Sequence, residues 1–389
     1  MPARPIVAIP GPTPVRAEIL SALAQPTLGH PQAAFVEIYR RTIGVLTELT
    51  GAHRFVVAGG AGTLAMEMAV VNALSPGERL LVVSHGLFGD RFAAIAQSHG
   101  IEVRRLVPEA AGQAVRPEDL AVALEEGGFG AVTITHVDTS TGVLAPVTSY
   151  LPAVQRSGAL LILDGVCATG GIEEPMAAWG VDYLVTTSQK ALGVPPGFAL
   201  LGVSRRALGK RSAMTGPVGG YYSDVLNWLP VMEDPGAYFA TPPVNLVVAL
   251  DRGLELVLEE GLERRIDRHR RQGRAMQAAW RALGLTAVPA PGLEAPTLSV
   301  LRYPDGVEDA AFRSAAEAEG ALVAGGVGQL KGQVFRVGHM GNVTRGELLA
   351  VVAAVECALA SCGHPVESGC GVAAAQAVLA EPVASVPGR

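Results

Sequence analysis

Two polar side chains follow apolar runs whose composition is typical of buried strands. Asp164 closes the run Ala159–Leu163, and Lys190 comes shortly after the run Tyr183–Thr186. A carboxylate at the end of a strand buried on both faces is costly unless a metal or a cationic nitrogen compensates it. A lysine among glycine, proline and apolar residues is partly desolvated, which favours a nucleophilic amine able to form a Schiff base. Taken singly, Asp164 is also compatible with a helix cap or turn, and Lys190 with an exposed loop lysine.

A turn of small residues offers a possible phosphate site. Residues 59–63, with the sequence Gly-Gly-Ala-Gly-Thr, lie directly between the apolar run Phe55–Ala58 and a helical pattern. Small residues let the backbone approach a ligand, and the N–H groups at a helix start favour a phosphate. The segment is not a G-x-G-x-x-G motif and no G-K-[ST] follows, which argues against dinucleotides and nucleoside triphosphates. An ordinary tight turn between a strand and a helix is the alternative.

An arginine interrupts an apolar strand near the C-terminal end. Arg336, within Val334–Val337, is compatible with a cleft-facing guanidinium that binds a carboxylate at two points, and also with a strand residue facing solvent. Together, a phosphate-binding turn, an acid, an amine and a carboxylate-binding arginine are what a pyridoxal phosphate enzyme acting on amino acids needs. In such an enzyme the acid keeps the pyridine nitrogen protonated, so that the ring can accept electrons.

The elements that must position these residues follow an alternating pattern. Apolar runs without period-2 polarity predict strands buried on both faces, and helix-compatible segments separate them. The predicted strands are Phe55–Ala58, Leu80–Val83, Ala131–Thr135, Ala159–Leu163, Tyr183–Thr186 and Phe198–Val203. The predicted helices between them are Thr63–Leu74, Arg91–Ser98, Pro117–Glu126 and Tyr150–Arg156. This alternation predicts an α/β fold whose mostly parallel central sheet is sandwiched by helices, with ligands beyond the carboxyl ends of the strands.

The rest of the chain predicts a smaller α+β domain at the C-terminal end. Val244–Val257 and Glu259–Leu283 are predicted as long helices, the second leading into a domain with strands at Leu298–Leu301 and Val334–Val337 and helices at Ala310–Glu319 and Arg345–Cys357. The expected divisions are an extended N-terminal arm at 1–16, a large domain at 17–260, a small domain at 261–375 and a tail at 376–389.

Composition excludes several classes of function. The chain has 389 residues, of which 49% are hydrophobic and 17% charged, with a net charge of −6, so nucleic acid is not an expected partner. No apolar stretch is long enough to span a membrane, and the N-terminal residues lack a secretory signal, so a cytoplasmic protein with reduced thiols is expected. Cys357, Cys362 and Cys370 lie near His364, but their spacing matches no C-x2-C pattern, and no metal is expected.

One cluster of arginines is interleaved with acids at helical spacing. We expect these residues to form a solvated, ion-paired helix face and not a nucleic-acid surface. The arginines are Arg264, Arg265, Arg268, Arg270, Arg271 and Arg274, and the acids are Glu259, Glu260, Glu263 and Asp267.

With these residues in place, the chain resembles the class V aminotransferases of pyridoxal phosphate fold type I, in particular the alanine–glyoxylate and serine–pyruvate aminotransferase group. The resemblance extends from Gly11 to about Cys357. The motifs that carry it are Asp164-Gly165-Val166, Ser188-Gln189-Lys190-Ala191-Leu192 and Pro195-Pro196-Gly197.

The resemblance implies roles around the cofactor ring. Lys190 would form the Schiff base with pyridoxal 5'-phosphate and then move the proton during catalysis, and Asp164 would pair with the pyridine nitrogen. Val166 would pack beneath the ring, and Phe88 would stack on the other face, where the family often has tryptophan. Ser140 would hydrogen-bond near the ring.

The resemblance also implies contacts for the phosphate and for the substrate. Within one chain the phosphate would be held by Ala61, Gly62, Thr63 and Gln189. Tyr238 and Thr241 would reach the phosphate of the neighbouring subunit, which makes the expected enzyme a homodimer with composite sites. Arg336 would bind the α-carboxylate of the substrate.

The activity that the resemblance implies is a ping-pong transamination from a small amino acid, alanine or serine, to glyoxylate or pyruvate. Residues 336–341 and the C-terminal extension also look like pyridoxamine–pyruvate aminotransferase, which uses free pyridoxamine as a substrate. A lyase or decarboxylating enzyme on the same scaffold is a further alternative. A non-catalytic binding protein is an alternative of a different class, against which the joint presence of Lys190, Asp164 and Arg336 argues.

Overall fold

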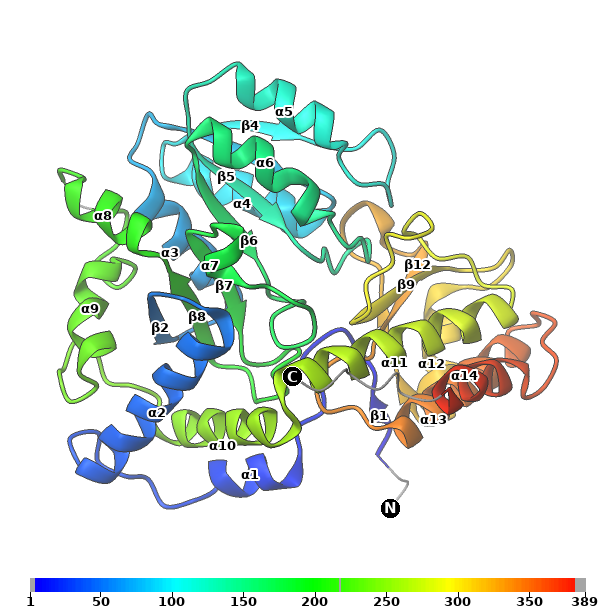
Figure 1. Cartoon of the computed structure of the whole chain (residues 1–389). Coiled ribbons are helices and arrows are strands. Elements are labelled where there is room, and N and C mark those ends of the chain that lie inside the picture. The colour runs from blue at the N-terminus through cyan, green and yellow to red at the C-terminus, as the bar shows by residue number, and fades with distance from the viewer. Residues whose placement is uncertain (1–3, 217, 382–389) are drawn as a thin grey trace.

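A seven-stranded sheet and a smaller three-stranded sheet organise the protein (Figure 1). The computed structural model describes residues 4–216 and 218–381. The strands are β1 (Ile6–Val7), β2 (Arg54–Gly59), β3 (Arg79–Val83), β4 (Glu102–Leu106), β5 (Phe129–Thr135), β6 (Leu160–Asp164), β7 (Tyr183–Thr187), β8 (Phe198–Val203), β9 (Leu298–Arg302), β10 (Ala321–Leu322), β11 (Ala324–Gly325) and β12 (Val334–Gly338). The helices are α1 (Ala17–Leu23), α2 (Ala33–Thr50), α3 (Gly62–Ala73), α4 (Leu87–Ser98), α5 (Pro117–Glu125), α6 (Val147–Ser157), α7 (Met176–Trp179), α8 (Arg205–Ala213), α9 (Val225–Glu233), α10 (Val244–Glu260), α11 (Leu262–Ala282), α12 (Asp309–Ala318), α13 (Arg345–Ser361) and α14 (Cys370–Ala380), with a 3-10 turn, η1, at Gly328–Leu330.

The large sheet is parallel except for one strand. Its order is β2-β8-β7-β6-β5-β3-β4, and only β8 runs against its neighbours. The predicted α/β fold with a mostly parallel sheet is therefore confirmed. Because β2, β6 and β7 run in the same direction, their carboxyl ends meet at one edge of the sheet, where the candidate residues follow them.

Both faces of this sheet are buried, as the unbroken apolar runs predict. In β3, Leu81 and Val83 belong to one hydrophobic core, while Leu80 and Val82 belong to the other. Helices α2, α5, α6 and α10 contribute to the first core, and α3, α4, α8 and α9 contribute to the second. Successive side chains of a strand point to opposite faces, so each strand feeds both cores and its ends are held rigidly.

The C-terminal third forms a unit with its own core. The antiparallel sheet β11-β12-β9 packs with α11, α12 and α13. The arm predicted as extended does not run free, because β1 pairs in parallel with β10 of this unit. In Figure 1, α11 runs from the end of α10 across to this unit, where α14 packs along it.

Several elements differ from the sequence prediction. Strand β4 was not predicted, because as an edge strand it carries exposed charge between apolar residues and lacks an unbroken apolar run. The alanine-rich segment after Ser361 contains α14, so the expected boundary between 375 and 376 falls inside a helix. Residues 1–3 of the expected arm and 382–389 of the expected tail lie outside the described residues.

The prediction of a solvated face for the basic cluster on α11 is wrong for Arg265. This arginine is only 2% exposed, and His269 and Gln272 on the same helix are buried beside it. The reason is that α11 bridges the two units, so one of its faces packs against loops from both. Other members do form exposed ion pairs, such as Arg270 with Asp267.

Two further features of the described residues bear on the expectations from composition. No helix among residues 4–216 and 218–381 is long and apolar enough to cross a membrane. Over the same residues, no group of three or more His, Cys, Asp or Glu side chains is placed to hold a metal ion.

Candidate active site

The candidate site begins with a buried acid at the end of β6. Asp164 is the last residue of that strand and is 3% exposed, and its Oδ1 accepts a hydrogen bond from the backbone N–H of Val166 at 3.0 Å. Burial raises the pKa of Asp164 to about 7, and the nearby carboxylates of Asp138 and Glu174 add to the rise. No ion pair joins Asp164 to a cation among the described residues. The acid therefore lacks the cationic partner that would make its burial favourable.

Lys190 reaches the same edge of the sheet from the loop that follows β7. Its half-buried side chain donates a hydrogen bond from Nζ to the backbone oxygen of Pro10. A Cβ atom placed on Gly11 would lie 2.5 Å from Nζ, and Gly11 has a φ of +122°, so only glycine allows this approach. The hydroxyl of Thr13 donates to the backbone oxygen of Lys190 at 2.9 Å. The N-terminal arm thus forms one wall around the lysine.

The small-residue turn after β2 leads into the uncapped start of α3. Ala61 occupies the N-cap position, and no side chain caps the helix among the described residues. Gly62 is buried, and a Cβ placed on it would lie 3.1 Å from a methyl group of Val166. Gln189, in the loop after β7, lies with its Oε1 2.6 Å from the hydroxyl of Thr187. The N–H groups of the first turn of α3 are thus available to an anion.

A buried carboxylate holds two of the predicted cofactor-binding residues in place. Asp138 accepts hydrogen bonds from the backbone N–H groups of Phe88 and Gly89 at 3.1 and 3.2 Å. It also accepts from the backbone N–H and the hydroxyl of Ser140. Burial raises the pKa of Asp138, and these four donors oppose that rise. Asp138 therefore fixes the backbone at Phe88 relative to the hydroxyl of Ser140.

Arg336 enters the site from the small unit. Its Nε donates to the backbone oxygen of Gly325 at 2.8 Å, and one Nη donates to the backbone oxygen of Thr139 at 3.3 Å. Burial lowers the pKa of Arg336, while the charge of Asp138 opposes that effect. Since neither contact uses a carboxylate, the guanidinium keeps donors for an anionic ligand.

Tyr238 and Thr241 stand apart from these residues. The Tyr238 hydroxyl and Thr241 Oγ1 are 3.1 Å apart, and the Tyr238 ring lies against His30. Tyr238 is 65% exposed, and no hydrogen bond joins either residue to the turn at 59–63 in the part of the chain that the structure describes. Within one chain, the two residues therefore do not join the site.

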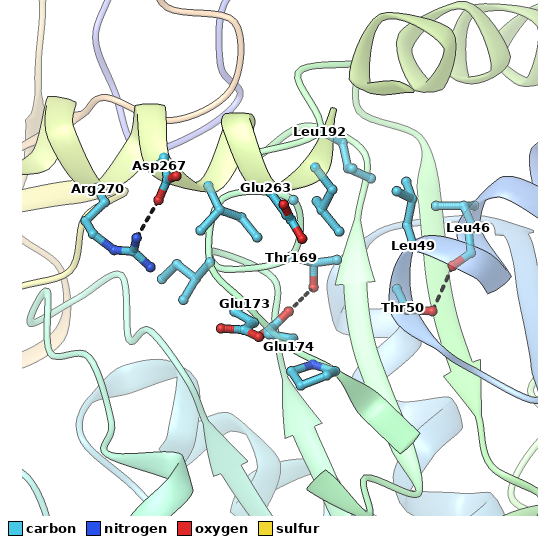
Figure 2. Close-up of a pocket in the computed structure, with 15 residues that line it drawn as sticks. Leu46, Leu49, Thr50, Thr169, Glu173, Glu174, Leu192, Glu263, Asp267 and Arg270 are labelled. Atoms are coloured by element: carbon cyan, nitrogen blue, oxygen red, sulfur yellow. Dashed lines mark hydrogen bonds and ion pairs between the residues drawn. The ribbon is translucent and has the colours of Figure 1, made fainter. Parts of the chain in front are cut away.

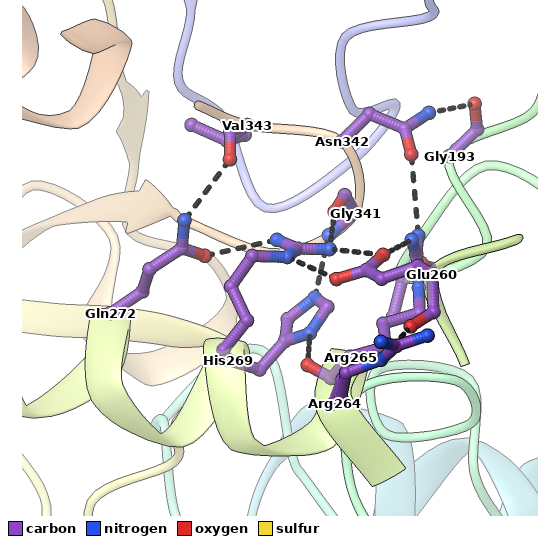
Figure 3. A network of polar contacts seen from close by, with 11 residues as sticks. Gly193, Glu260, Arg264, Arg265, His269, Gln272, Gly341, Asn342 and Val343 are labelled. Atoms are coloured by element: carbon purple, nitrogen blue, oxygen red, sulfur yellow. Dashed lines mark hydrogen bonds and ion pairs between the residues drawn. The ribbon is translucent and has the colours of Figure 1, made fainter. Parts of the chain in front are cut away.

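Arg265, expected to lie on a solvated helix face, ties the Lys190 loop to the small unit. The guanidinium of Arg265 donates to the backbone oxygen of Ala191, to Glu260 and to the Asn342 side chain (Figure 3). Asn342 in turn donates to the backbone oxygen of Gly193 at 2.9 Å. This network, on the helix that joins the two units, links the loop of Lys190 to the loop that follows β12, the strand of Arg336.

His269 extends the same network one turn further along α11. Its Nε2 accepts from the backbone N–H of Gly341, and its Nδ1 bonds the backbone oxygen of Arg265 (Figure 3). Burial holds the pKa of His269 well below its usual value, so the ring is neutral with its proton on Nδ1. The residue serves as a neutral bridge between the helix and the loop after β12.

A cavity of about 440 Å³ lies beside the site (Figure 2). Leucines of α2 and Leu192, two residues beyond Lys190, form apolar walls, and Glu263 and Asp267 line the cavity from α11, where Asp267 pairs with Arg270. Glu174 lines the cavity but is already bonded to Thr169 and His136, at 2.6 and 2.7 Å. This cavity therefore holds no buried polar group in need of a ligand, and it is separate from the residues that converge on Asp164.

Two more residues of the site had no predicted role. Cys167 is buried with its Sγ 2.7 Å from the hydroxyl of Thr139, and burial raises the pKa of its thiol. Asp138 lies two residues before Ser140 in the motif Asp138-Thr139-Ser140-Thr141-Gly142, in which only the serine had an expected role. A polar residue inside a motif assigned to one neighbour is the signal that could have identified Asp138, whereas the place of Cys167 follows from the fold alone.

The residues present fit the pyridoxal phosphate that the resemblance implies. Asp164 is a buried acid without a cation, and a protonated ring nitrogen would supply one. The uncapped start of α3 would hold the phosphate, and the amine of Lys190, bound to a backbone oxygen, is the group that would form the Schiff base.

Comparisons with known proteins point to one family of enzymes. The model of the aminotransferase class-V family matches residues 20–326. The chain is 35% identical to alanine–glyoxylate aminotransferase 1 of Saccharomyces cerevisiae over 354 residues, 86% of this chain and 91% of that protein. The crystal structure of ureidoglycine–glyoxylate aminotransferase from Bacillus subtilis superposes with a TM-score of 0.93 at 28% identity, over 98% of this chain and 99% of the other. That of pyridoxamine–pyruvate aminotransferase from Mesorhizobium loti superposes with a TM-score of 0.92 at 28% identity, over 97% of each chain.

Proposed function

The chain belongs to the class V aminotransferase family, and from this membership we propose that it transfers the amino group of a small amino acid, alanine or serine, to glyoxylate or pyruvate. The proposed cofactor is pyridoxal 5'-phosphate and the proposed mechanism is ping-pong. The observation that carries the proposal is the placement of Asp164 and Lys190 at the carboxyl ends of two adjacent strands, where a buried acid without a cation and a lysine amine lie at the same edge of the sheet.

When bound, pyridoxal phosphate supplies an electrophilic carbon and an electron sink. Asp164 would keep the ring nitrogen protonated, because an ionised carboxylate stabilises a cation beside it. Lys190 moves a proton from the substrate Cα, and its flexible stem lets Nζ leave Pro10 to do so. Arg336 binds the substrate carboxylate, which orients Cα toward Lys190. Phe88 and Ser140, whose backbone N–H groups donate to Asp138, would lie on either side of the ring and hold it in place.

We further propose that the active unit is a homodimer. Tyr221 and Tyr238 are 78% and 65% exposed, and Tyr221 lies against Phe239, which contacts Tyr222 and Trp228. An exposed aromatic surface of this kind favours association. Across the dimer, Tyr238 and Thr241 would complete the phosphate site of the other chain. A cytoplasmic location is part of the proposal, because all four cysteines are free.

Transamination between pyridoxamine and pyruvate is the second candidate, favoured by the similarity to the Mesorhizobium loti enzyme. A free vitamin without phosphate needs no phosphate site. The uncapped start of α3 and the exposed hydroxyl of Thr63 instead favour a retained, phosphorylated cofactor. We therefore prefer the first candidate.

Two measurements test the proposal. Borohydride reduction of the purified protein with pyridoxal phosphate, followed by peptide mapping, should place the label on Lys190, and a label on another lysine would refute the assignment. A donor–acceptor screen with alanine, serine, glycine, pyridoxamine, glyoxylate and pyruvate then separates the candidates. Turnover with pyridoxamine alone as donor would favour the second candidate.

A further inference from the structure

An arginine with no assigned role lies against two of the predicted cofactor-binding residues. Arg91 is in the second turn of α4, and its guanidinium carbon sits 4.7 Å from the centre of the Phe88 ring. One of its Nη groups donates to the hydroxyl of Thr63 at 3.2 Å. Phe88 and Arg91 are three residues apart and share a face of the helix. The arginine thus joins the aromatic residue to the start of α3.

The charge of Arg91 has no counter-ion in the part of the chain that the structure describes. Its neighbour Asp90 is bonded to Ser84 at 2.9 Å and paired with Arg105 at 3.2 Å. No carboxylate lies within ion-pair distance of Arg91 among residues 4–216 and 218–381. A half-buried guanidinium that touches one neutral hydroxyl and one aromatic ring keeps several N–H donors for an anion.

The other proposed contacts to the cofactor phosphate are neutral. They are backbone N–H groups at the start of α3, the Thr63 hydroxyl, the Gln189 amide and, from the other chain, the hydroxyls of Tyr238 and Thr241. A phosphate monoester carries close to two negative charges at neutral pH. A helix N-terminus offers only about half a positive charge against them.

We propose that Arg91 supplies the positive charge that recognises the cofactor phosphate, and that it holds Phe88 in place while doing so. The inference rests on the proposed function, since it requires a bound phosphorylated cofactor. Guanidinium–phosphate hydrogen bonds are charge-assisted and strong. Arg91 would therefore make the protein select pyridoxal phosphate over the same molecule without phosphate.

A purely structural role is the competing explanation. In that case Arg91 only anchors Phe88 to Thr63, and its loss should weaken the binding of phosphorylated and unphosphorylated cofactor alike. The ratio of the two affinities separates the explanations, whereas activity alone does not.

The test measures binding of pyridoxal phosphate and of pyridoxal to the cofactor-free protein by fluorescence titration. Arg91→Met keeps the apolar stem and removes the charge, Arg91→Lys keeps the charge, and Phe88→Leu removes only the ring. Arg105→Met is the matched control. Arg105 lies beside the same helix, is half exposed and pairs with Asp90, so the change removes an arginine without touching the proposed phosphate contacts.

Arg91→Met should weaken pyridoxal phosphate binding by roughly 10- to 100-fold and pyridoxal binding far less. Arg91→Lys should restore most of the selectivity, Phe88→Leu should weaken both ligands equally, and Arg105→Met should leave both unchanged. Equal losses for the two ligands in Arg91→Met, or no loss, would overturn the role of Arg91 and leave the proposed function standing. If the unmodified protein binds pyridoxal as tightly as pyridoxal phosphate, the proposed function itself fails.

Discussion

The residues predicted for the site form two groups that differ in how deeply a single chain buries them and how firmly its hydrogen bonds hold them. On the side of the large sheet, Asp164, Ser140 and Cys167 are buried and held by hydrogen bonds within their own chain. On the other side, Tyr238 is 65% exposed and Tyr221 is 78% exposed, with neighbours drawn from the same short segment. The difference indicates that one chain positions the buried residues at the edge of the sheet, whereas Tyr238 remains exposed, as the proposed contact with a second chain requires.

The largest expected effect comes from the enclosed side. Lys190→Ala removes both the Schiff-base amine and the group that moves the proton, and the second role alone is worth roughly 10²- to 10⁴-fold in rate. Measured as kcat of the overall transamination, the loss should be several orders of magnitude. Lys210→Ala is the control, since that lysine is half-buried and paired with Glu78 away from the site. Turnover within tenfold of the unmodified enzyme would place the chemistry elsewhere.

The second effect concerns the network that joins the two units. Arg265→Met leaves the buried backbone oxygen of Ala191 without its donor, which costs about 1–3 kcal/mol in the free energy of unfolding. Glu260 still pairs with Arg268, so the loss stays below that of a fully broken ion pair. Urea unfolding measures it, and Arg264→Met on the exposed side of the same helix is the control.

Equal stability of Arg265→Met and Arg264→Met would mean that the Lys190 loop holds its place without Arg265. Asn342→Ala provides a milder check, because it removes the link to Gly193 and leaves the charge of Arg265 in place.

The burial of Arg265 in this network is a feature that the sequence pattern could not predict. Unbroken apolar runs predicted β5, β6, β7 and β8, because strands covered on both faces exclude charge. Arg265 has the same composition context as its exposed neighbours, and helical spacing alone does not say which face of α11 another unit will cover. Burial of a charge in such a helix depends on tertiary contacts, here with the backbone oxygen of Ala191 and the Asn342 side chain.

The candidate site residues also divide into those that local sequence patterns identify and those whose place depends on tertiary contacts. Asp164 and Lys190 could be identified because strand ends in a parallel sheet meet at one edge, so that their convergence follows from topology. Arg336 required the placement of the small sheet, which no local pattern contains. The place of Tyr238 depends on a second chain and stays a prediction.

The pH dependence of folding stability tests whether Asp164 lacks a cationic partner in the cofactor-free protein. In the unfolded chain an aspartate has a pKa near 3.9, and burial raises that of Asp164 to about 7 in the cofactor-free protein. Between about pH 4 and pH 7 the folded state therefore holds a proton that the unfolded state releases, so stability falls as pH rises through this window. Asp164→Asn cannot titrate and should show a smaller decline.

Thermal unfolding of the cofactor-free forms from about pH 5 to pH 7.5 measures this difference, and each kcal/mol should shift the unfolding midpoint by about 1 °C in a protein of this size. Added pyridoxal phosphate should remove the decline in the unmodified protein, because the ring nitrogen then stabilises the carboxylate. Identical pH profiles for both cofactor-free forms would show that Asp164 is not held as a neutral acid.

The exposed side gives an effect that is read from mixtures of two variant chains, each of which must be inactive by itself. Tyr238→Phe with Thr241→Ala removes two hydroxyl groups from the proposed phosphate contacts, each worth about 1.5–3 kcal/mol as a hydrogen bond to a charged group. If those hydroxyls serve the partner, a chain carrying both changes still has its own Lys190 and lacks only what its partner supplies. Mixing it with inactive Lys190→Ala chains should then create heterodimers in which one site has an intact lysine and intact Tyr238 and Thr241. Such mixtures should regain up to half of the dimer activity, because two-fold symmetry gives every heterodimer one complete site and one site with both defects.

Tyr221→Phe, a change on the same exposed surface, should give no such recovery pattern because it loses little activity alone. If the mixture stays inactive after proven subunit exchange, Tyr238 and Thr241 act within their own chain, and the far wall of the site must be closed by some other part of that chain.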